Sequence, residues 1–261
     1  MNTSKRFLPR VIPILLLKSR DSLVKTKRFR DPVYVGDPLN AVKIFNEKEV
    51  DELVLLDITA SKKSREPDYE YIEQIAAECF MPVTYGGGVK TLDQFQKIIA
   101  CGIEKVAINS ATVDCPELVS EAAAHFGSSS VVVSLDVMND FFKGRKIFSH
   151  MKQKLTDNDP TEEAKKMESL GAGEILLQSV NRDGTMEGYD LELIKSISHN
   201  ISIPLIACGG AGKLSDFTQA LEAGASAVGA GSKFVFYGKH RAVLINYLSH
   251  KELEQLSAAE R

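Results

Sequence analysis

The stretch "MPVTYGGGVKTLDQFQKIIACGIEKVAINS" at residues 81–110 returns in altered form at residues 203–232, which read "IPLIACGGAGKLSDFTQALEAGASAVGAGS". The two stretches align without a gap, so that Gly88 meets Gly210. Each copy runs from an apolar strand-like segment through a Gly-rich turn and an amphipathic stretch to a second apolar segment. A repeat of this size predicts two similar halves of one closed domain, because solenoid units span only about 20–50 residues.

Eight apolar or β-branched segments are spaced along the whole chain, with amphipathic stretches between them. Pro or Asp begins many of these stretches and Gly ends them, as helix capping prefers. Strands that are apolar on both faces and separated by helices form parallel sheets with both faces covered. We therefore predict a (β/α)8 TIM barrel, one domain over residues 1–261 with half-barrels at about 8–125 and 128–250. The predicted strands are residues 10–17, 53–58, 82–86, 105–109, 130–136, 174–179, 203–208 and 227–231, and predicted helices include 37–50, 92–102, 115–127, 160–173 and 214–225.

The composition excludes several classes of protein. A net charge of −3 gives no general attraction for nucleic acid. No segment approaches the roughly 18 consecutive apolar residues of a membrane span, and the start "MNTSKRFLPR" lacks the apolar region of a secretory signal. The four cysteines form no C-x-x-C pair, which argues against a zinc site. We expect a cytoplasmic protein without a metal or other cofactor.

The two Gly-rich turns are candidate phosphate sites. Both follow a predicted strand and precede a predicted helix, where glycine lets the backbone approach an anion and helix amides favour it. Tight turns alone would also explain the glycines. Because the two turns recur in register, we expect an elongated small molecule with a phosphate at each end. The residues concerned are Gly87, Gly88, Asn109 and Ser110 in the first half, and Gly209, Gly210 and Ser232 in the second.

Three carboxylates stand where a predicted strand meets its loop, namely Asp57, Asp136 and Asp183. Each could serve as a general acid, a general base or a ligand contact at the carboxyl end of the barrel. Alternatively, one or two of them only cap the next element. None of the five histidines falls at a predicted strand end, so acid–base chemistry is assigned to the carboxylates.

A second group of charged residues marks the opposite end of the strands. Arg10 and Lys105 begin predicted strands, while Glu52 and Glu174 precede or begin two others. In most barrels this face serves stability, so the charge pattern by itself favours a structural ring of salt bridges. The loop at residues 18–31 holds six Lys or Arg, and could be either a lid over a phosphorylated ligand or a mobile solvated loop.

Taken together, these motifs resemble the cyclase subunit of imidazole glycerol phosphate synthase, a (β/α)8 barrel of histidine biosynthesis. The resemblance runs from residue 10 to about residue 250 and includes "DELVLLDITAS", "KVAINSA", "SLGAGEILLQSVNRDGT" and "IPLIACGGAGK". It implies a heterodimer with a glutaminase subunit, whose ammonia enters at the amino-terminal face and crosses the barrel to a bisphosphate substrate. Matched by position, it implies an ammonia gate of Arg10, Glu52, Lys105 and Glu174, phosphate contacts at Gly88, Asn109, Ser110, Gly184, Gly210 and Ser232, and a catalytic role for Asp136.

The chain departs from this family at one catalytic position. The second catalytic aspartate of the family belongs on the first strand, and the matching residue here is Leu16. The internal repeat also sets Leu16 against Asp136. Leucine cannot transfer a proton, so its presence removes a factor on the order of 10²–10⁴ from acid–base catalysis. The segments "SLVKTKRFRDPVYVGDP" and "SHMKQKLTDNDP" are also rewritten relative to the family.

Other motifs, among them "LVKT", "RDPVYVGDP" and "FYGKHRAVLINY", are similar to a paralogue group associated with acetamidino modification of sugars in surface polysaccharide. That resemblance implies a barrel that passes ammonia from the glutaminase to a separate sugar amidotransferase in O-antigen (lipopolysaccharide) biosynthesis. Two alternatives stay open. One is a true cyclase in which Asp21, Asp57 or Asp183 replaces the missing acid. The other is a barrel that binds its partners without conducting ammonia.

Overall fold

The structure is a computed structural model that describes residues 8–150 and 152–258. The first seven residues, where no secretory signal is expected, lie outside the described part. Eight parallel strands form a closed barrel in the order β10-β11-β12-β1-β4-β5-β6-β7, which β10 and β7 close by pairing with each other. The predicted (β/α)8 barrel is therefore confirmed. Its strands are β1 (Arg10–Ser19), β4 (Leu53–Asp57), β5 (Val83–Gly86), β6 (Lys105–Ile108), β7 (Val131–Asp140), β10 (Glu174–Ser179), β11 (Leu205–Cys208) and β12 (Ala227–Ala230).

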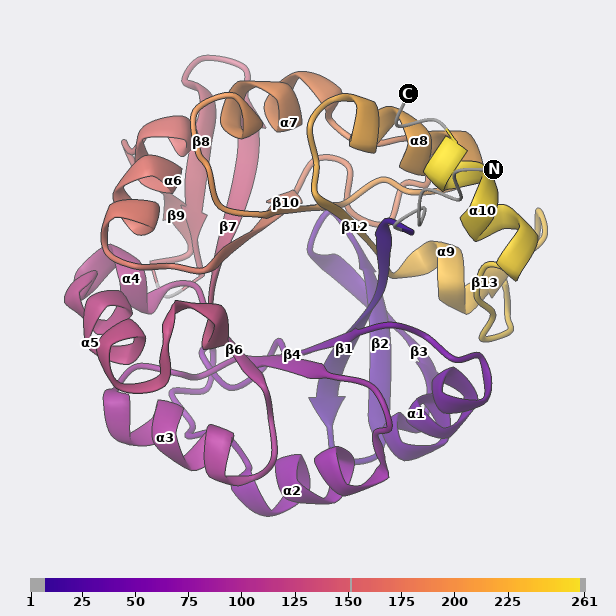
Figure 1. Cartoon of the computed structure of the whole chain (residues 1–261), viewed down its shortest axis with the longest axis horizontal. Coiled ribbons are helices and arrows are strands. Elements are labelled where there is room, and N and C mark those ends of the chain that lie inside the picture. Colours follow the sequence, from indigo (N-terminus) through magenta and orange to yellow (C-terminus); the bar gives the residue numbers. More distant parts are fainter. Residues whose placement is uncertain (1–7, 151, 259–261) are drawn as a thin grey trace, which may run out of the picture.

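Helices surround this barrel on the outside, as Figure 1 shows. Capping side chains begin several of them: Asp37 accepts from the Asn40 amide ahead of α1, and Thr91 accepts from the Gln94 amide ahead of α3. Within the described residues, no helix is long and apolar enough to cross a membrane. The helices are α1 (Pro38–Glu47), α2 (Tyr69–Glu78), α3 (Leu92–Ala100), α4 (Ala111–Asp114), α5 (Glu117–Phe126), α6 (Pro160–Ser169), α7 (Leu191–Ser198), α8 (Leu214–Glu222), α9 (Ser232–Val235) and α10 (His250–Ala258), with a 3-10 turn at Ser128–Ser130.

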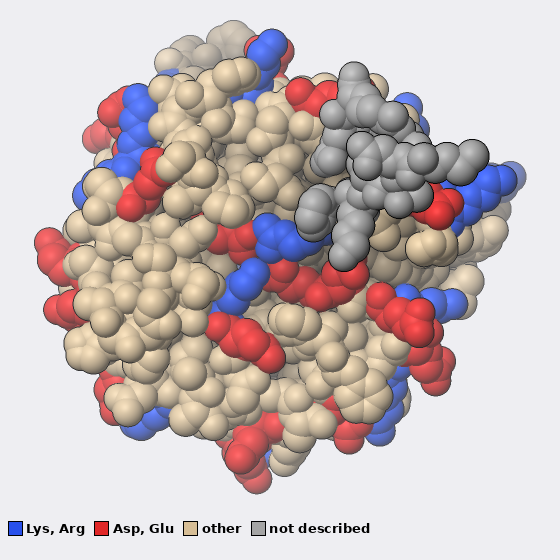
Figure 2. Space-filling model, viewed as in Figure 1, with Lys and Arg blue, Asp and Glu red and all other residues tan. Residues whose placement is uncertain are grey.

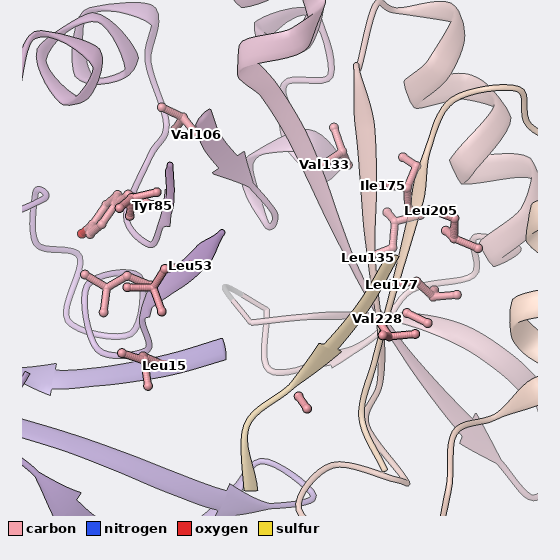
Figure 3. Packing of buried hydrophobic residues seen from close by; sticks show 14 of the residues in the cluster. Leu15, Leu53, Tyr85, Val106, Val133, Leu135, Ile175, Leu177, Leu205 and Val228 are labelled. Atoms are coloured by element: carbon pink, nitrogen blue, oxygen red, sulfur yellow. The ribbon is translucent and has the colours of Figure 1, made fainter. Parts of the chain in front are cut away.

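Alternate residues of each barrel strand face two separate cores. The outer core packs strands against helices, and the residues labelled in Figure 3, from Leu15 on β1 to Val228 on β12, come from all eight strands. The inner core fills the barrel with smaller clusters of Ile, Val, Leu and Ala side chains. On β1 the inward-facing apolar residues are Ile12, Ile14 and Leu16. The period of two therefore places Leu16 inside the barrel, near its carboxyl end.

Three short antiparallel hairpins follow β1, β7 and α9, and the first two continue the barrel sheet while the third is a separate two-stranded sheet. The first is β2 (Ser22–Lys27) with β3 (Arg30–Gly36), and it corrects the sequence prediction of a loop at residues 18–31. Beyond the barrel, β7 pairs with β8 (Gly144–Ser149), which pairs with β9 (Lys154–Leu155). The third hairpin joins β13 (Phe236–Tyr237) to β14 (Ala242–Val243). Since β1 and β7 are equivalent strands of the internal repeat, the first two hairpins occupy equivalent places.

Candidate functional site

A cavity of about 170 Å³ opens at the carboxyl ends of the barrel strands. Residues from both halves of the chain line this cavity. They include nearly all residues that were predicted from the sequence to lie at the carboxyl ends of the strands. An adjoining small pocket is lined by Gly87, Gly88, Asn109 and Ser110. The predicted residues that line the main cavity are Leu16, Asp57, Gly87, Asn109, Ser110, Asp136, Asp183, Gly184, Gly209, Gly210 and Ser232.

Leu16 and Asp136 lie on opposite sides of this cavity. Their strands, β1 and β7, are four positions apart in the eight-stranded ring, and both residues line the cavity. Asp136 is only 6% exposed. Residues 16 and 136 are equivalent positions of the internal repeat. Only position 136 carries a carboxylate, and the facing position carries the apolar side chain of Leu16.

Asp136 is held by two neighbours that come from different strands. The Asn109 amide Nδ2 donates to Asp136 Oδ2 at 2.7 Å, and His150 Nε2 lies 2.7 Å from the same oxygen. The His150 ring lies 5.2 Å from the rings of both Phe29 and Phe148. These contacts show that the sequence-based expectation of no histidine at the site was wrong, because β8 carries His150 back over the mouth. The sequence marked this segment only as rewritten relative to the family and did not indicate where His150 would lie.

Asp57 supports the loop after β4. Its Oδ1 accepts from the Thr59 and Ala60 amides at 2.9 Å, and its Oδ2 lies 2.6 Å from Arg65 Nη2. With both oxygens engaged in this way, the carboxylate caps the local turn, which was one of the two interpretations left open. Asp21, at the turn after β1, is exposed and accepts from Ser19 Oγ at 2.7 Å.

Asp183 joins the first hairpin to the loop after β10. Its Oδ2 accepts from Thr26 Oγ1 at 2.7 Å and from the Phe29 amide at 3.2 Å, and its carbonyl accepts from the Arg28 amide at 3.0 Å. Burial raises the pKa of Asp183 above its ordinary value and outweighs these hydrogen bonds, which act in the opposite direction. The pKa of Asp183, which lines the cavity, is thus shifted toward the protonated form. Within the described residues, no group of three or more His, Cys, Asp or Glu is placed to hold a metal ion.

Gly184 allows the first hairpin to approach this loop. Its φ is +66°, and a Cβ there would overlap the Thr26 carbonyl oxygen. Gly144 has a similar φ of +68° but open space around its Cβ position. We expect Gly144→Ala to lower the free energy of unfolding by about 1 kcal/mol, which is the backbone cost alone. Gly184→Ala should lower it by about 3 kcal/mol because the hairpin must also move. Urea denaturation of the two variants measures the difference, and equal losses would contradict the close approach.

Lys25 places a buried ammonium group beside the cavity. Its Nζ donates to the Ile14 carbonyl oxygen, and the residue is 5% exposed. Burial lowers the pKa of Lys25 to about 8, although nearby Asp183 acts to raise it. The charged form is therefore disfavoured in the folded protein relative to the unfolded chain.

This shift predicts a pH dependence of stability. The folded-state pKa of Lys25 lies below its unfolded value, so the cost of burying the charge is fully present below about pH 8 and is relieved as the pH rises toward 10.5. We expect Lys25→Met to be more stable than the wild type at pH 7 by on the order of 3 kcal/mol, with the gap closing by pH 10. Chemical denaturation of both proteins across this range tests it, and a constant gap would exclude the titration.

The two Gly-rich turns face each other across the mouth. They follow β5 and β11, which are four strands apart in the barrel. At Gly87 and Gly210 the φ values are +124° and +114°, and a Cβ would overlap the carbonyl oxygens of Asp57 and Gly188 respectively. Only glycine fits such close approaches in this conformation. The turns are thus required for packing, and the same bare backbone lines the cavity where a phosphate group could bind.

A ring of four charged side chains closes the amino-terminal end of the barrel. Arg10 contacts Glu52 at 3.0 Å and also contacts Glu174, while Lys105 Nζ lies 3.0 Å from Glu52 and 3.2 Å from Glu174. Figure 2 shows basic and acidic atoms gathered over the middle of the face in view. Burial lowers the pKa of Arg10, but the hydrogen bonds and charges of Glu174 and Glu52 outweigh it, so that the pKa is raised overall.

The ring combines buried acids with partly exposed bases. The glutamate side chains are 5% and 7% exposed, whereas those of Arg10 and Lys105 are 32% and 21% exposed. Thr84, fully buried on β5, donates to Glu52 at 3.3 Å from the barrel side. Every predicted member of the ring is present, and the cations cover the glutamates on the solvent side. Arg10 and Lys105 are thus the members of the ring that solvent reaches most easily.

Comparison with known proteins places the chain among barrels of this type. Residues 10–241 match the family model described as "Histidine biosynthesis protein". The chain is 51% identical to "Putative imidazole glycerol phosphate synthase subunit hisF2" of Pseudomonas aeruginosa, over 94% of this chain and 98% of the relative. It is 45% identical to "Putative imidazole glycerol phosphate synthase subunit hisF3" of Vibrio vulnificus, over 97% of each. Identity to "Imidazole glycerol phosphate synthase subunit HisF" of Petrotoga mobilis is 43%, over 89% of this chain and 92% of the relative.

Proposed function

We propose a function from one premise: the chain belongs to the histidine biosynthesis protein family, as a member of the cyclase-subunit type named HisF. In our proposal it is the ammonia-conducting barrel of a glutamine-dependent amidotransferase system, and it works with a glutaminase subunit as a heterodimer. The ammonia serves the acetamidino modification of a sugar in surface polysaccharide, which a separate amidotransferase carries out in the cytoplasm. Its own cyclase activity is weak or lost.

The observation that carries this proposal is the contrast between the two ends of the barrel. At the amino-terminal end the four-residue ring is complete, with both cations bridging both glutamates. At the carboxyl end Leu16 faces Asp136, and Asp136 is already held by Asn109 and His150. An intact entrance together with an altered catalytic pair favours a conduit over a cyclase.

The inner core supplies the path in this proposal. Between the ring and the cavity lie apolar side chains such as Ile12, Val54 and Val132, together with the hydroxyl of Thr84. Neutral ammonia passes such surroundings far more easily than ammonium, because a charge pays a large desolvation cost there. In this proposal the inner core therefore acts as the filter and the ring as the gate. The Gly-rich turns and Ser110 and Ser232 would bind a phosphorylated ligand at the mouth.

A true cyclase of histidine biosynthesis is the second candidate function. It is favoured by Asp183, which lines the cavity and has a raised pKa, so that it could supply the acid that Leu16 lacks. The names of the relatives fit this alternative as well as the first.

The two candidates differ in the reaction that the purified barrel performs by itself. We would supply it with ammonium and the bisphosphate substrate of the histidine-pathway cyclase, next to an Asp-bearing cyclase of the same family. The conduit proposal expects slow turnover or none. Turnover as fast as that of the Asp-bearing enzyme would overturn it and establish the cyclase.

A further inference from the structure

Most of the large exposed apolar side chains in the described part of the chain lie on the three hairpins that follow β1, β7 and α9. Among the described residues, nine large hydrophobic side chains are exposed, and seven of them lie on these hairpins. We call these hairpins the collar: residues 22–36, 138–149 and 236–244. Phe141 and Phe142, at the tip of the β7–β8 hairpin, are 94% and 92% exposed and pack edge to face at 5.2 Å. The collar also exposes Tyr34, Tyr237, Val243 and Leu244.

Each hairpin of the collar reaches the rim of the cavity. Thr26 and Phe29 of the first hairpin line the cavity, and so does His150, the residue that follows β8. From the third hairpin, Arg241 donates to the Gly184 carbonyl oxygen at 3.0 Å. The hairpins that carry the exposed apolar residues are therefore connected to the rim of the cavity.

The collar is also basic, in contrast to the rest of the chain. It holds nine Lys and Arg against two Asp, and of these cations Lys25 is buried and Arg145 pairs with Asp190. The remaining residues hold 23 Lys and Arg against 33 Asp and Glu. Exposed aromatic side chains next to arginine are typical of protein interfaces. A second copy of this chain is a poor occupant, because two collars facing each other would bring like charges together.

We propose that the collar is the docking surface for the protein that consumes the ammonia, and that this partner presents an acidic patch with apolar pockets for Phe141 and Phe142. The inference rests on the proposed function and adds to it the surface at which ammonia passes from the barrel to the partner. Ammonia that leaves an open mouth at neutral pH takes up a proton and is lost to the solvent as ammonium. A partner seated on the collar would cover the opening and receive neutral ammonia directly.

The test uses cells that lack this chain and are complemented with the wild type or a variant. The measured quantity is the amidinated fraction of the surface sugar by mass spectrometry, in low-ammonium medium and again with added ammonium chloride. We expect Phe141→Ala/Phe142→Ala to lower this fraction about tenfold in low ammonium, since buried aromatic anchors carry much of an interface's affinity. Ammonium chloride should restore it. The purified variant should unfold at the same urea concentration as the wild type, which shows that it folds.

A second, matched pair of variants tests whether the positive charge of the collar contributes to docking. Lys143 on the collar and Lys195 on the outer surface of α7 are both exposed lysines. We expect Lys143→Glu to lower the amidinated fraction and Lys195→Glu to leave it unchanged. A lowered fraction in both variants, or in neither, would contradict an acidic partner at the collar.

The outcomes separate this inference from the proposed function. Lys105→Glu, at the opposite end of the barrel, tests whether the barrel conducts ammonia. If Lys105→Glu abolishes glutamine-dependent amidination and Phe141→Ala/Phe142→Ala does not lower it, the conduit stands and the collar is wrong. If neither variant lowers it, the proposed function itself fails. Collar-dependent binding to phosphatidylglycerol vesicles with normal amidination would assign the collar to a lipid surface and overturn the inference.

Discussion

Replacing Lys105 with glutamate is expected to abolish product formation from glutamine while leaving product formation from added ammonium intact. Lys105 lies 3.0 Å from Glu52 and 3.2 Å from Glu174, so the variant would set a third carboxylate against two that are nearly buried. Arg10 alone cannot neutralise them. The repulsion would force the ring apart and admit water, which destroys a filter for neutral ammonia. The measurement compares amidinated product with glutamine or with ammonium chloride as the nitrogen source.

A folding control is essential for this variant. Breaking a buried ion pair by removing one partner costs on the order of 3–5 kcal/mol, so Lys105→Glu could lose activity by unfolding. Cooperative urea denaturation of the purified variant excludes that explanation, whereas product formation from ammonium does not, because added ammonium reaches the amidotransferase without passing through the barrel. Lys105→Arg, which keeps the charge, should retain most glutamine-dependent activity. If glutamine-dependent product formation is the same in Lys105→Glu as in the wild type, the barrel is a scaffold that does not conduct ammonia.

Restoring an acid at residue 16 is expected to recover cyclase activity only when His150 is also removed. Leu16→Asp would place a carboxylate across the cavity from Asp136. In the single variant, however, His150 still holds Asp136 Oδ2 at 2.7 Å, and so we expect little gain. With His150→Gly added, Asp136 is freed on one side and turnover should rise by on the order of 10², within the range usual for general acid–base catalysis.

The assay measures turnover of the histidine-pathway bisphosphate with saturating ammonium. His150→Gly alone serves as the matched control and should stay inactive, because it leaves only one carboxylate of the pair. Full recovery by Leu16→Asp alone would show that His150 does not restrain Asp136. No recovery in a correctly folded double variant would mean that the rewritten hairpins, and not Leu16, prevent the reaction.

The barrel could be predicted from the sequence because its strands have a regular pattern of apolar residues. The hairpins could not be predicted because their strands and turns lack such a pattern. All eight predicted strands occur within a few residues of their expected bounds. The first hairpin instead turns at Arg28 and Phe29, both with positive φ and neither a glycine or asparagine, so the usual turn signal is missing. Irregular register near Leu23 and Lys25 also breaks the alternation that would have marked a strand.

The residues of the candidate site also differ in how well they could be predicted from the sequence. Arg10, Glu52, Lys105 and Glu174 could be grouped from sequence, because strand starts in a closed parallel barrel must meet at one end. Their contacts agree with that grouping, while their role stays a proposal. His150 escaped prediction because its place depends on how far β8 folds back toward β7, which no local pattern specifies.

The ring of charges also bears on how a duplicated half-barrel can evolve. Glu52 and Glu174 are equivalent in the internal repeat, but the equivalents of Arg10 and Lys105 in the second half are Ser130 and Ala227. Both cations therefore come from one copy. Two second halves joined in tandem would bury two glutamates with no base between them, and two first halves would crowd four cations around two acids. A complete ring therefore requires one copy of each half, and neither half can replace the other.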